Sequence, residues 1–173
     1  MGARNVRGVL FVLAAGIAAA AFDARAQDAK PPGLQWLAYG EAVARAGQED
    51  KHVLVDFYTS WCGWCKVMDS KTYTDPAVMQ LLSQHFLIAK VNAESSRKFP
   101  VGEKQLSGRE LAAEFGVRQF PMTWFLKPDG TRLAQLPGYI EAQRFAKILE
   151  YVQTRGYNKE AQDDAKESPE EKR

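Results

Sequence analysis

The stretch VLVDFYTSWCGWCK, residues 53–66, decides the fold of this chain. Its β-branched and aromatic first half predicts a strand over residues 53–58 that is covered on both faces of a sheet. A short polar turn follows, and then come the only two cysteines of the sequence, Cys62 and Cys65. If a helix begins at Cys62, unsatisfied backbone N–H groups and the positive helix end favour a thiolate there. The stretch therefore predicts a nucleophilic sulfur at the end of a buried strand.

Two cysteines separated by two residues can close a small disulfide ring and reopen it. We expect Cys62 to be the exposed, attacking thiol and Cys65 to be the inner thiol that resolves a mixed disulfide. One alternative is a stable structural staple, although so short a loop constrains little of the unfolded chain. Another is a zinc or copper site, in which Met68 could help to hold copper(I). His52 and His85 lie outside any ligand spacing, so the sequence predicts no metal site.

Asp56 is an acid in the middle of the apolar run, where burial is unfavourable unless the side chain has a partner or a task. Burial would raise its pKa toward neutrality, and it could then exchange a proton with Cys65. Lys90 occupies the same kind of position in the second apolar run, so a neighbouring parallel strand would bring its ammonium group near. The alternatives are that Asp56 faces solvent and that Lys90 extends its ammonium to the surface.

Phe120-Pro121 introduces the third predicted strand, and the bond before Pro121 is either an ordinary trans bond or a cis bond. A cis bond would leave the backbone of Phe120 free to pair with an extended substrate segment next to Cys62. Trp61 and Trp64 flank the sulfurs and could form a docking surface. Trp61 could equally pack beneath the loop.

Length and charge limit what this motif can belong to. The 173 residues fit one domain with tails, and a hydrophobic share of 46% is ordinary for a globular protein with a core. The 23 basic residues nearly balance the 21 acidic ones without forming a basic stripe, so we expect no nucleic-acid partner. With both cysteines in one motif, no second pair is left for a structural disulfide framework.

The N-terminus has the pattern of an export signal. Arg4 and Arg7 give a positive start, residues 9–22 an apolar run and residues 24–26 a small-x-small cleavage site after Ala26. We therefore expect residues 1–26 to be a cleaved signal peptide and the mature protein, which would be about neutral, to be periplasmic. An uncleaved membrane anchor is the alternative, but the apolar run is shorter than the ~20 residues that a span needs.

The mature chain divides into three predicted parts: a flexible lead-in at 27–33, a folded domain at 34–155 and a charged, disordered tail at 156–173. Within the domain, residues 92–106 are polar and predict a surface loop. Hydrophobic periodicity, caps and turn residues predict the other elements. The expected helices cover residues 38–50, 62–69, 76–84, 107–116 and 142–152, and the expected strands cover 53–58, 86–92, 122–126 and 132–136, with a possible short strand at 34–36. This order predicts an α/β fold in which a mixed sheet lies between helices.

The residues from about 34 to 155 resemble the thioredoxin superfamily. The signature is Val55-Asp56-Phe57-Tyr58 through Trp61-Cys62-Gly63-Trp64-Cys65-Lys66, with a lysine on the next strand and Gly-Val-Arg-Gln-Phe-Pro before the third. The segment 72–78 is similar to exported thioredoxin-like proteins and to the C-terminal domain of periplasmic disulfide reductases of the DsbD type. The resemblance implies the thioredoxin fold, with four to five strands in the mixed sheet and helices on both faces.

The resemblance also implies roles for individual residues. Cys62 would be the nucleophile, Cys65 the resolving thiol, Asp56 the buried acid with Lys90 beside it, and Pro121 a cis proline. The expected client-binding residues are Trp61, Gly63, Trp64, Phe120, Pro121 and Gly138.

The expected function is that of a periplasmic thiol-disulfide oxidoreductase that mainly reduces protein disulfides through its C-G-W-C dithiol. The expected partners are disulfide-containing protein clients and a membrane-embedded thiol electron donor, and we expect a monomer without a cofactor. Trp64 stands where a plain cytosolic thioredoxin has proline, which leaves the redox potential open. The alternatives are a disulfide oxidant or isomerase and a copper-handling protein that uses the fold without turnover.

Overall fold

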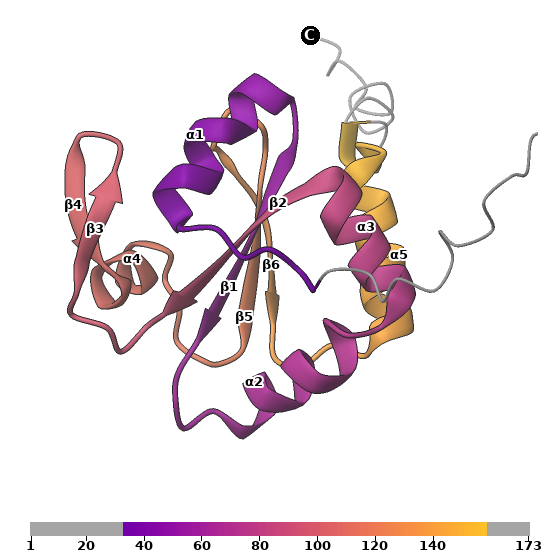
Figure 1. The fold of residues 1–173 in the computed structure, drawn as a ribbon, viewed down its shortest axis with the longest axis horizontal. Coiled ribbons are helices and arrows are strands. Elements are labelled where there is room, and N and C mark those ends of the chain that lie inside the picture. Colours follow the sequence, from indigo (N-terminus) through magenta and orange to yellow (C-terminus); the bar gives the residue numbers. More distant parts are fainter. Residues whose placement is uncertain (1–32, 159–173) are drawn as a thin grey trace, which may run out of the picture. The chain divides into compact units, whose positions relative to one another are not determined.

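The computed structural model describes residues 33–158. The predicted signal peptide at 1–26, the lead-in up to residue 32 and the tail beyond residue 158 lie outside the described residues. Figure 1 shows the arrangement of the elements. In chain order they are α1 (Tyr39–Glu49), β1 (His52–Tyr58), α2 (Gly63–Val67), the π-helical turn η2 (Met68–Thr72), α3 (Pro76–His85), β2 (Phe86–Asn92), β3 (Lys98–Val101), β4 (Lys104–Ser107), α4 (Gly108–Glu114), β5 (Met122–Leu126), β6 (Arg132–Pro137) and α5 (Ala142–Gln153).

The central sheet has four strands in the order β2-β1-β5-β6. The crossover through α2, η2 and α3 makes β1 and β2 parallel, whereas β5 runs antiparallel to both β1 and β6. The mixed sheet between helices is therefore confirmed, with four strands. The register places Asp56 opposite Lys90 on one side and opposite Thr123 on the other.

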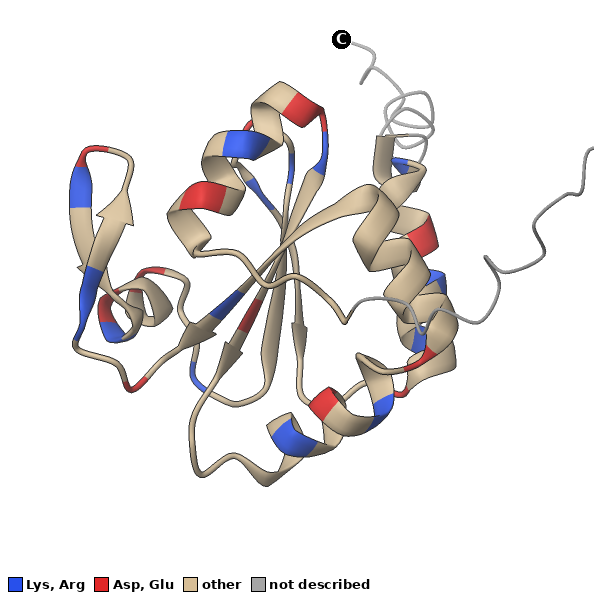
Figure 2. Ribbon diagram, viewed as in Figure 1, with Lys and Arg blue, Asp and Glu red and all other residues tan. Residues whose placement is uncertain are grey.

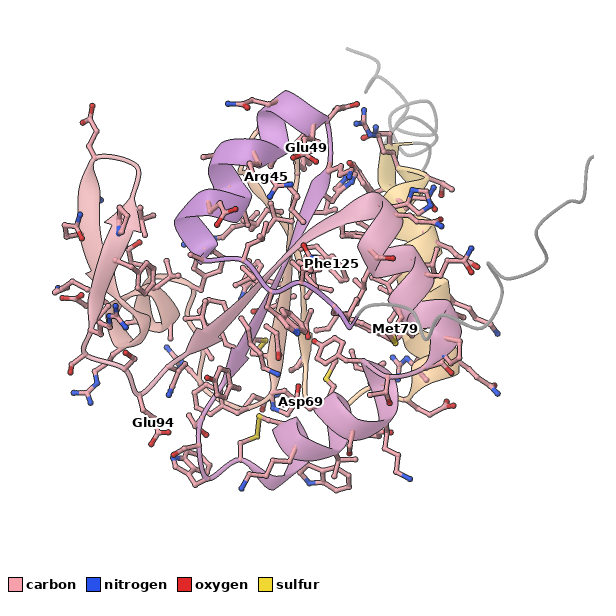
Figure 3. The ribbon with its side chains drawn as sticks, viewed as in Figure 1. Arg45, Glu49, Asp69, Met79, Glu94 and Phe125 are labelled. Carbon is pink, nitrogen blue, oxygen red and sulfur yellow. A yellow bond between two sulfur atoms is a disulfide. The ribbon has the colours of Figure 1, made fainter. Side chains whose placement is uncertain are left out.

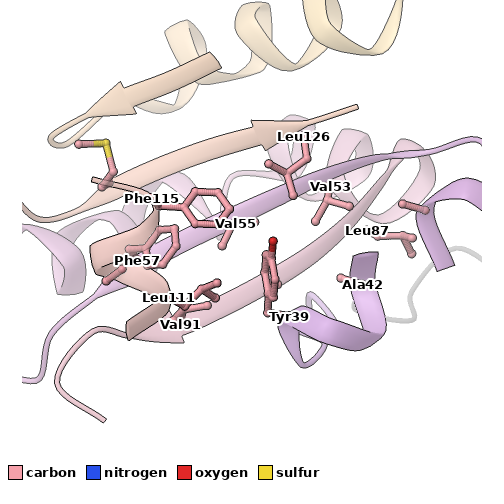
Figure 4. Packing of buried hydrophobic residues seen from close by; sticks show 14 residues of the cluster. Tyr39, Ala42, Val53, Val55, Phe57, Leu87, Val91, Leu111, Phe115 and Leu126 are labelled. Carbon is pink, nitrogen blue, oxygen red and sulfur yellow. The ribbon is translucent and has the colours of Figure 1, made fainter. Parts of the chain in front are cut away.

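The side chains of β1 alternate between two hydrophobic cores, one on each face of the sheet. Val53, Val55 and Phe57 pack with residues of α1 and α4 on the first face, which Figure 4 shows from close by. Leu54 packs with residues of η2, α3 and α5 on the second face. Asp56 shares the face of Leu54, because residues two apart along a strand point the same way. This alternation places the one acid of β1 beneath the segment that follows the cysteines.

Local sequence signals explain where several helices begin and end. Asp75 caps α3 by accepting hydrogen bonds from the backbone N–H groups of Ala77 and Val78, with Pro76 at the first helical position. Ser107 and Glu110 form the predicted capping box at the start of α4. These caps fix the starts of α3, which leads into β2, and of α4, which follows β4.

The prediction of a loop over residues 92–106 is wrong, because this segment contains the hairpin of β3 and β4. Gly102 makes the tight turn with a positive φ of 59°. Phe99, Val101 and Leu106 turn toward the first core as partly buried residues. Pro100 lies within β3, because a two-stranded ribbon has open edges where the missing N–H is tolerated. The possible strand at 34–36 is reduced to a single bridge between Leu37 and Ala89.

The two glycines of α1 predict opposite effects of substitution by alanine. A Cβ on Gly40 would lie 2.2 Å from the backbone oxygen of Pro100, whereas on Gly47 its nearest neighbour is 3.5 Å away. Gly40→Ala should therefore displace the hairpin and lower the unfolding free energy by about 1–3 kcal/mol. Gly47→Ala, the matched control, should raise it by about 0.5–1 kcal/mol because alanine favours the helix. Urea denaturation measures both changes, and equal changes would contradict the packing of β3 on α1.

Within residues 33–158, no helix is long and apolar enough to cross a membrane.

Candidate active site

Cys62 and Cys65 form a disulfide just beyond the end of β1. Figure 3 draws it as a yellow bond at the end of the molecule where Asp69 and Glu94 are labelled. Cys62 is the N-cap of α2, and its Sγ accepts a hydrogen bond of 3.0 Å from the backbone N–H of Cys65. This donor is one of the helix-start N–H groups that stabilise negative charge on a sulfur.

The expectation that the outer sulfur is exposed is wrong for this oxidised form. Cys62 is 4% exposed and Cys65 is 3% exposed. In this form the Cys62 sulfur is bonded to that of Cys65 and also contacts the Cys65 N–H group.

Asp56 lies beneath this segment and is 2% exposed, so the alternative of a solvent-facing acid is excluded. Figure 2 shows the single acidic position on β1 beside the single basic position on β2. Lys90 Nζ lies 3.6 Å from Asp56 Oδ2. Burial raises the pKa of the Asp56 carboxyl to about 7, and the lysine charge offsets part of that increase. The carboxyl can therefore hold or release a proton near neutral pH.

The sequence did not indicate a role for Asp69. This residue lies in η2 and forms an ion pair with Lys90 of β2. It lies four residues after Cys65 along the helical segment, a spacing that brings side chains to the same face. The negative charge of Asp69 also helps to raise the pKa of Asp56. Lys90 thus pairs with two acids, Asp56 on β1 and Asp69 in η2.

Three aromatic rings also surround the Lys90 ammonium, whose side chain is 19% exposed. Its Nζ lies 5.1, 5.3 and 5.6 Å from the ring centres of Trp36, Tyr58 and Tyr73. Such contacts stabilise a cation over the faces of the rings. Lys90 is therefore held among partners instead of reaching out to solvent.

Among the described residues, three buried oxygens around this pair make no hydrogen bond of good geometry: Asp56 Oδ1, Tyr73 Oη and Thr123 Oγ1. The Tyr73 hydroxyl nevertheless lies close enough to Asp56 and Thr123 to interact with both. Burial, followed by the nearby charge of Asp56, raises the pKa of the Tyr73 hydroxyl well above its ordinary value. Tyr73 is therefore a neutral hydroxyl at physiological pH. Buried polar groups without good hydrogen bonds destabilise a fold. Three of them beside Asp56 therefore indicate a site that is kept for function.

The loop before β5 carries the Phe120–Pro121 peptide bond, which is cis as the resemblance implied. Gly138 lies next to it, because its N–H donates a hydrogen bond of 2.8 Å to the backbone oxygen of Pro121. Gly138 has a φ of 81°, a conformation that favours glycine. The structure thus brings together two of the predicted client-binding residues.

Both tryptophans beside the disulfide are exposed, Trp61 by 68% and Trp64 by 62%. Trp61 packs edge-on against Phe120, with 5.9 Å between ring centres. Trp64 stacks on Tyr139 at 5.4 Å, a contact that the sequence did not predict. Gly63 lies between them and is exposed, with nothing within 4 Å of an added Cβ. We call the four rings of Trp61, Phe120, Trp64 and Tyr139 the aromatic rim.

Among residues 33–158, no three His, Cys, Asp or Glu side chains are grouped so that they could hold a metal ion. Met68, the residue named for copper, is 1% exposed and packs in the second core.

Comparisons with known proteins agree with this geometry. A family model described as a thioredoxin-like domain matches residues 39–153. The disulfide bond reductase DsbH of Chlamydia pneumoniae is 28% identical over 104 residues, which are 60% of this chain and 62% of that protein. The thiol:disulfide interchange protein DsbD 1 of Pseudomonas aeruginosa is 31% identical over 116 residues, which are 66% of this chain and 18% of that protein. The chain thus spans less than two thirds of the length of either relative.

A solved structure supports the same relationship. The thioredoxin from Thermus thermophilus matches with a TM-score of 0.58 and 30% sequence identity, over 70% of this chain and 88% of that one. The family match covers the strand, the disulfide segment and the cis proline loop described above. The chain therefore belongs to the thioredoxin-like domain family.

Proposed function

We propose that this protein is a periplasmic thiol-disulfide oxidoreductase that mainly reduces the disulfides of protein clients. In the reduced enzyme, the Cys62 thiolate attacks a client disulfide, forms a mixed disulfide and releases one client thiolate. The Cys65 thiol then loses its proton and attacks the Cys62 sulfur, which releases the second client thiolate. Two electrons pass from the cysteine pair to the client, and the enzyme ends with the Cys62–Cys65 disulfide.

The observation that carries this mechanism is the placement of a buried, titratable carboxyl beneath the cysteine segment. Asp56 has a pKa of about 7, so its carboxylate form can accept the Cys65 proton at neutral pH. Burial raises that pKa, the charge of Lys90 lowers it, and the charge of Asp69 raises it further. Lys90 thereby acts on the proton transfer through Asp56.

The client would bind across the aromatic rim and the cis proline loop. An extended client segment would pair with the backbone of Phe120 next to Pro121 and Gly138. Trp61, Gly63 and Trp64 would face the client from the cysteine side, because all three are exposed beside the disulfide. Large exposed aromatic side chains are typical of surfaces that bind another chain.

The reductive direction and the periplasmic location rest on the sequence and on the relatives. The N-terminal residues have the pattern of an export signal. The name of the chlamydial relative, disulfide bond reductase, favours reduction over oxidation. A periplasmic reductase needs renewed electrons, so we propose a membrane-embedded thiol donor as its second partner, and we propose that the enzyme acts as a monomer.

The equilibrium reduction potential, measured against glutathione, tests the direction. A value near the ~−270 mV of thioredoxin supports a reductase, whereas a value as high as ~−120 mV would identify an oxidant. Cell fractionation of the full-length chain tests the location, and recovery in the cytoplasm would contradict export.

A further inference from the structure

Glu94, labelled in Figure 3, lies just beyond β2 and contacts the turn that leads to the cysteines. Its Oε2 accepts a hydrogen bond of 2.6 Å from the backbone N–H of Ser60 and one of 2.7 Å from the Ser60 hydroxyl. A backbone hydrogen bond also closes this turn, because the N–H of Cys62 donates to the backbone oxygen of Thr59 at 3.3 Å. The carboxylate thus binds the residue two positions before the attacking sulfur.

The backbone around Glu94 is fixed by contacts on both sides. Its own N–H donates to Asn92 Oδ1 at 2.9 Å, and the N–H of Ala93 donates to the oxygen of Tyr58 at 2.9 Å. Arg109, in the first turn of α4, donates from Nη2 to the backbone oxygen of Glu94 at 3.3 Å. The end of β2 and the start of α4 therefore hold the carboxylate at a defined place on the turn.

Glu94 carries its negative charge throughout the physiological pH range. The hydrogen bonds from Ser60 lower the pKa of its carboxyl, with smaller contributions from Trp61 and from the charge of Arg109. Among the hydrogen bonds of residues 33–158, Glu94 supplies the one carboxylate that accepts from the turn before Cys62. A fixed negative charge near a thiol disfavours its thiolate form.

Resting on the proposed function, we propose that Glu94 is a positioning residue that keeps the Cys62–Cys65 pair reducing and holds the active-site turn in place. A stable Cys62 thiolate stabilises the reduced form of the cysteine pair. An enzyme whose reduced form is stabilised is a stronger oxidant of its clients. The negative charge of Glu94 disfavours the Cys62 thiolate and therefore makes the cysteine pair more reducing. Its two hydrogen bonds to Ser60 also keep Trp61 and Cys62 in their positions on the turn.

Three variants separate the charge from the hydrogen bonds. Glu94→Gln removes the charge but keeps an oxygen that can accept from Ser60, whereas Glu94→Ala removes both. Glu103→Gln is the matched control, because Glu103 is an exposed acid in the distant turn between β3 and β4. The readouts are the reduction potential against glutathione, the pKa of the Cys62 thiol from thiolate absorbance, and the rate of disulfide exchange.

We expect Glu94→Gln to shift the equilibrium with glutathione toward the reduced enzyme about tenfold, which is about 30 mV, and to lower the Cys62 pKa. Glu94→Ala should show the same shift and slower exchange, and Glu103→Gln should match the wild type. A shift in Glu94→Ala without one in Glu94→Gln, or no shift in either, would overturn the proposal. A wild-type enzyme that exchanges no disulfides would instead overturn the proposed function.

Discussion

The Cys62→Ser variant is expected to lose disulfide reduction down to the uncatalysed rate, a decrease of at least about a thousandfold. A serine hydroxyl is not ionised at neutral pH and cannot form the mixed disulfide. The measurement is the initial rate of reduction of a disulfide-bonded protein, such as insulin, with dithiothreitol as the electron source.

Two further variants complete this experiment. Ser83 lies on the exposed side of α3, so the control variant Ser83→Ala should retain the wild-type rate. When it is reduced beforehand and assayed without dithiothreitol, Cys65→Ser should stop after the first attack, because the resolving thiol is missing. If Cys65→Ser abolished the attack while Cys62→Ser retained it, the assigned order of the two sulfurs would be reversed.

The Asp56→Asn variant is expected to be more stable than the wild type and to exchange disulfides more slowly. Folding raises the carboxyl pKa from 3.8 to about 7, so the folded state binds more protons than the unfolded state between these values. The unfolding free energy of the wild type therefore falls as pH rises from about 4 to 7, by about 4 kcal/mol. Asparagine has no charge to bury, so its gain in stability should be present at pH 9 and absent at pH 4.

The same variant should slow disulfide exchange about a hundredfold near pH 7, because no group accepts the Cys65 proton. The deficit should shrink toward pH 9, where the thiol ionises without help. Urea denaturation and exchange rates across pH 4 to 9 measure the two effects, with Glu103→Gln as the control. Equal rates of variant and wild type between pH 6 and 9 would remove the proton-transfer role, and equal stabilities at pH 9 would contradict the burial of a charge.

Much of the fold could be predicted from the sequence because its signals are local. The apolar runs at 53–58 and 86–92 became β1 and β2 since both faces of the sheet are covered. The acid and the lysine inside these runs could be predicted as neighbours, because parallel strands in register place Asp56 beside Lys90. The capping box before α4 needed only four consecutive residues.

The features that the sequence did not predict depend on contacts between distant segments. The β3–β4 hairpin is stabilised by packing on α1, whereas the polar composition of residues 92–106 had indicated a loop. The contacts of Glu94 with Ser60 and of Trp64 with Tyr139 join residues more than thirty positions apart. Asp69 alone had a usable signal, its helical spacing from Cys65.

The most direct test of the account is the intact mass of reduced Cys65→Ser protein after incubation with a disulfide-bonded protein. We predict one covalent adduct, joined through Cys62 and released by dithiothreitol, that disappears when Cys62 is also replaced by serine. The account would be contradicted if no adduct formed while the wild type reduced the same disulfide, or if the adduct survived the loss of Cys62.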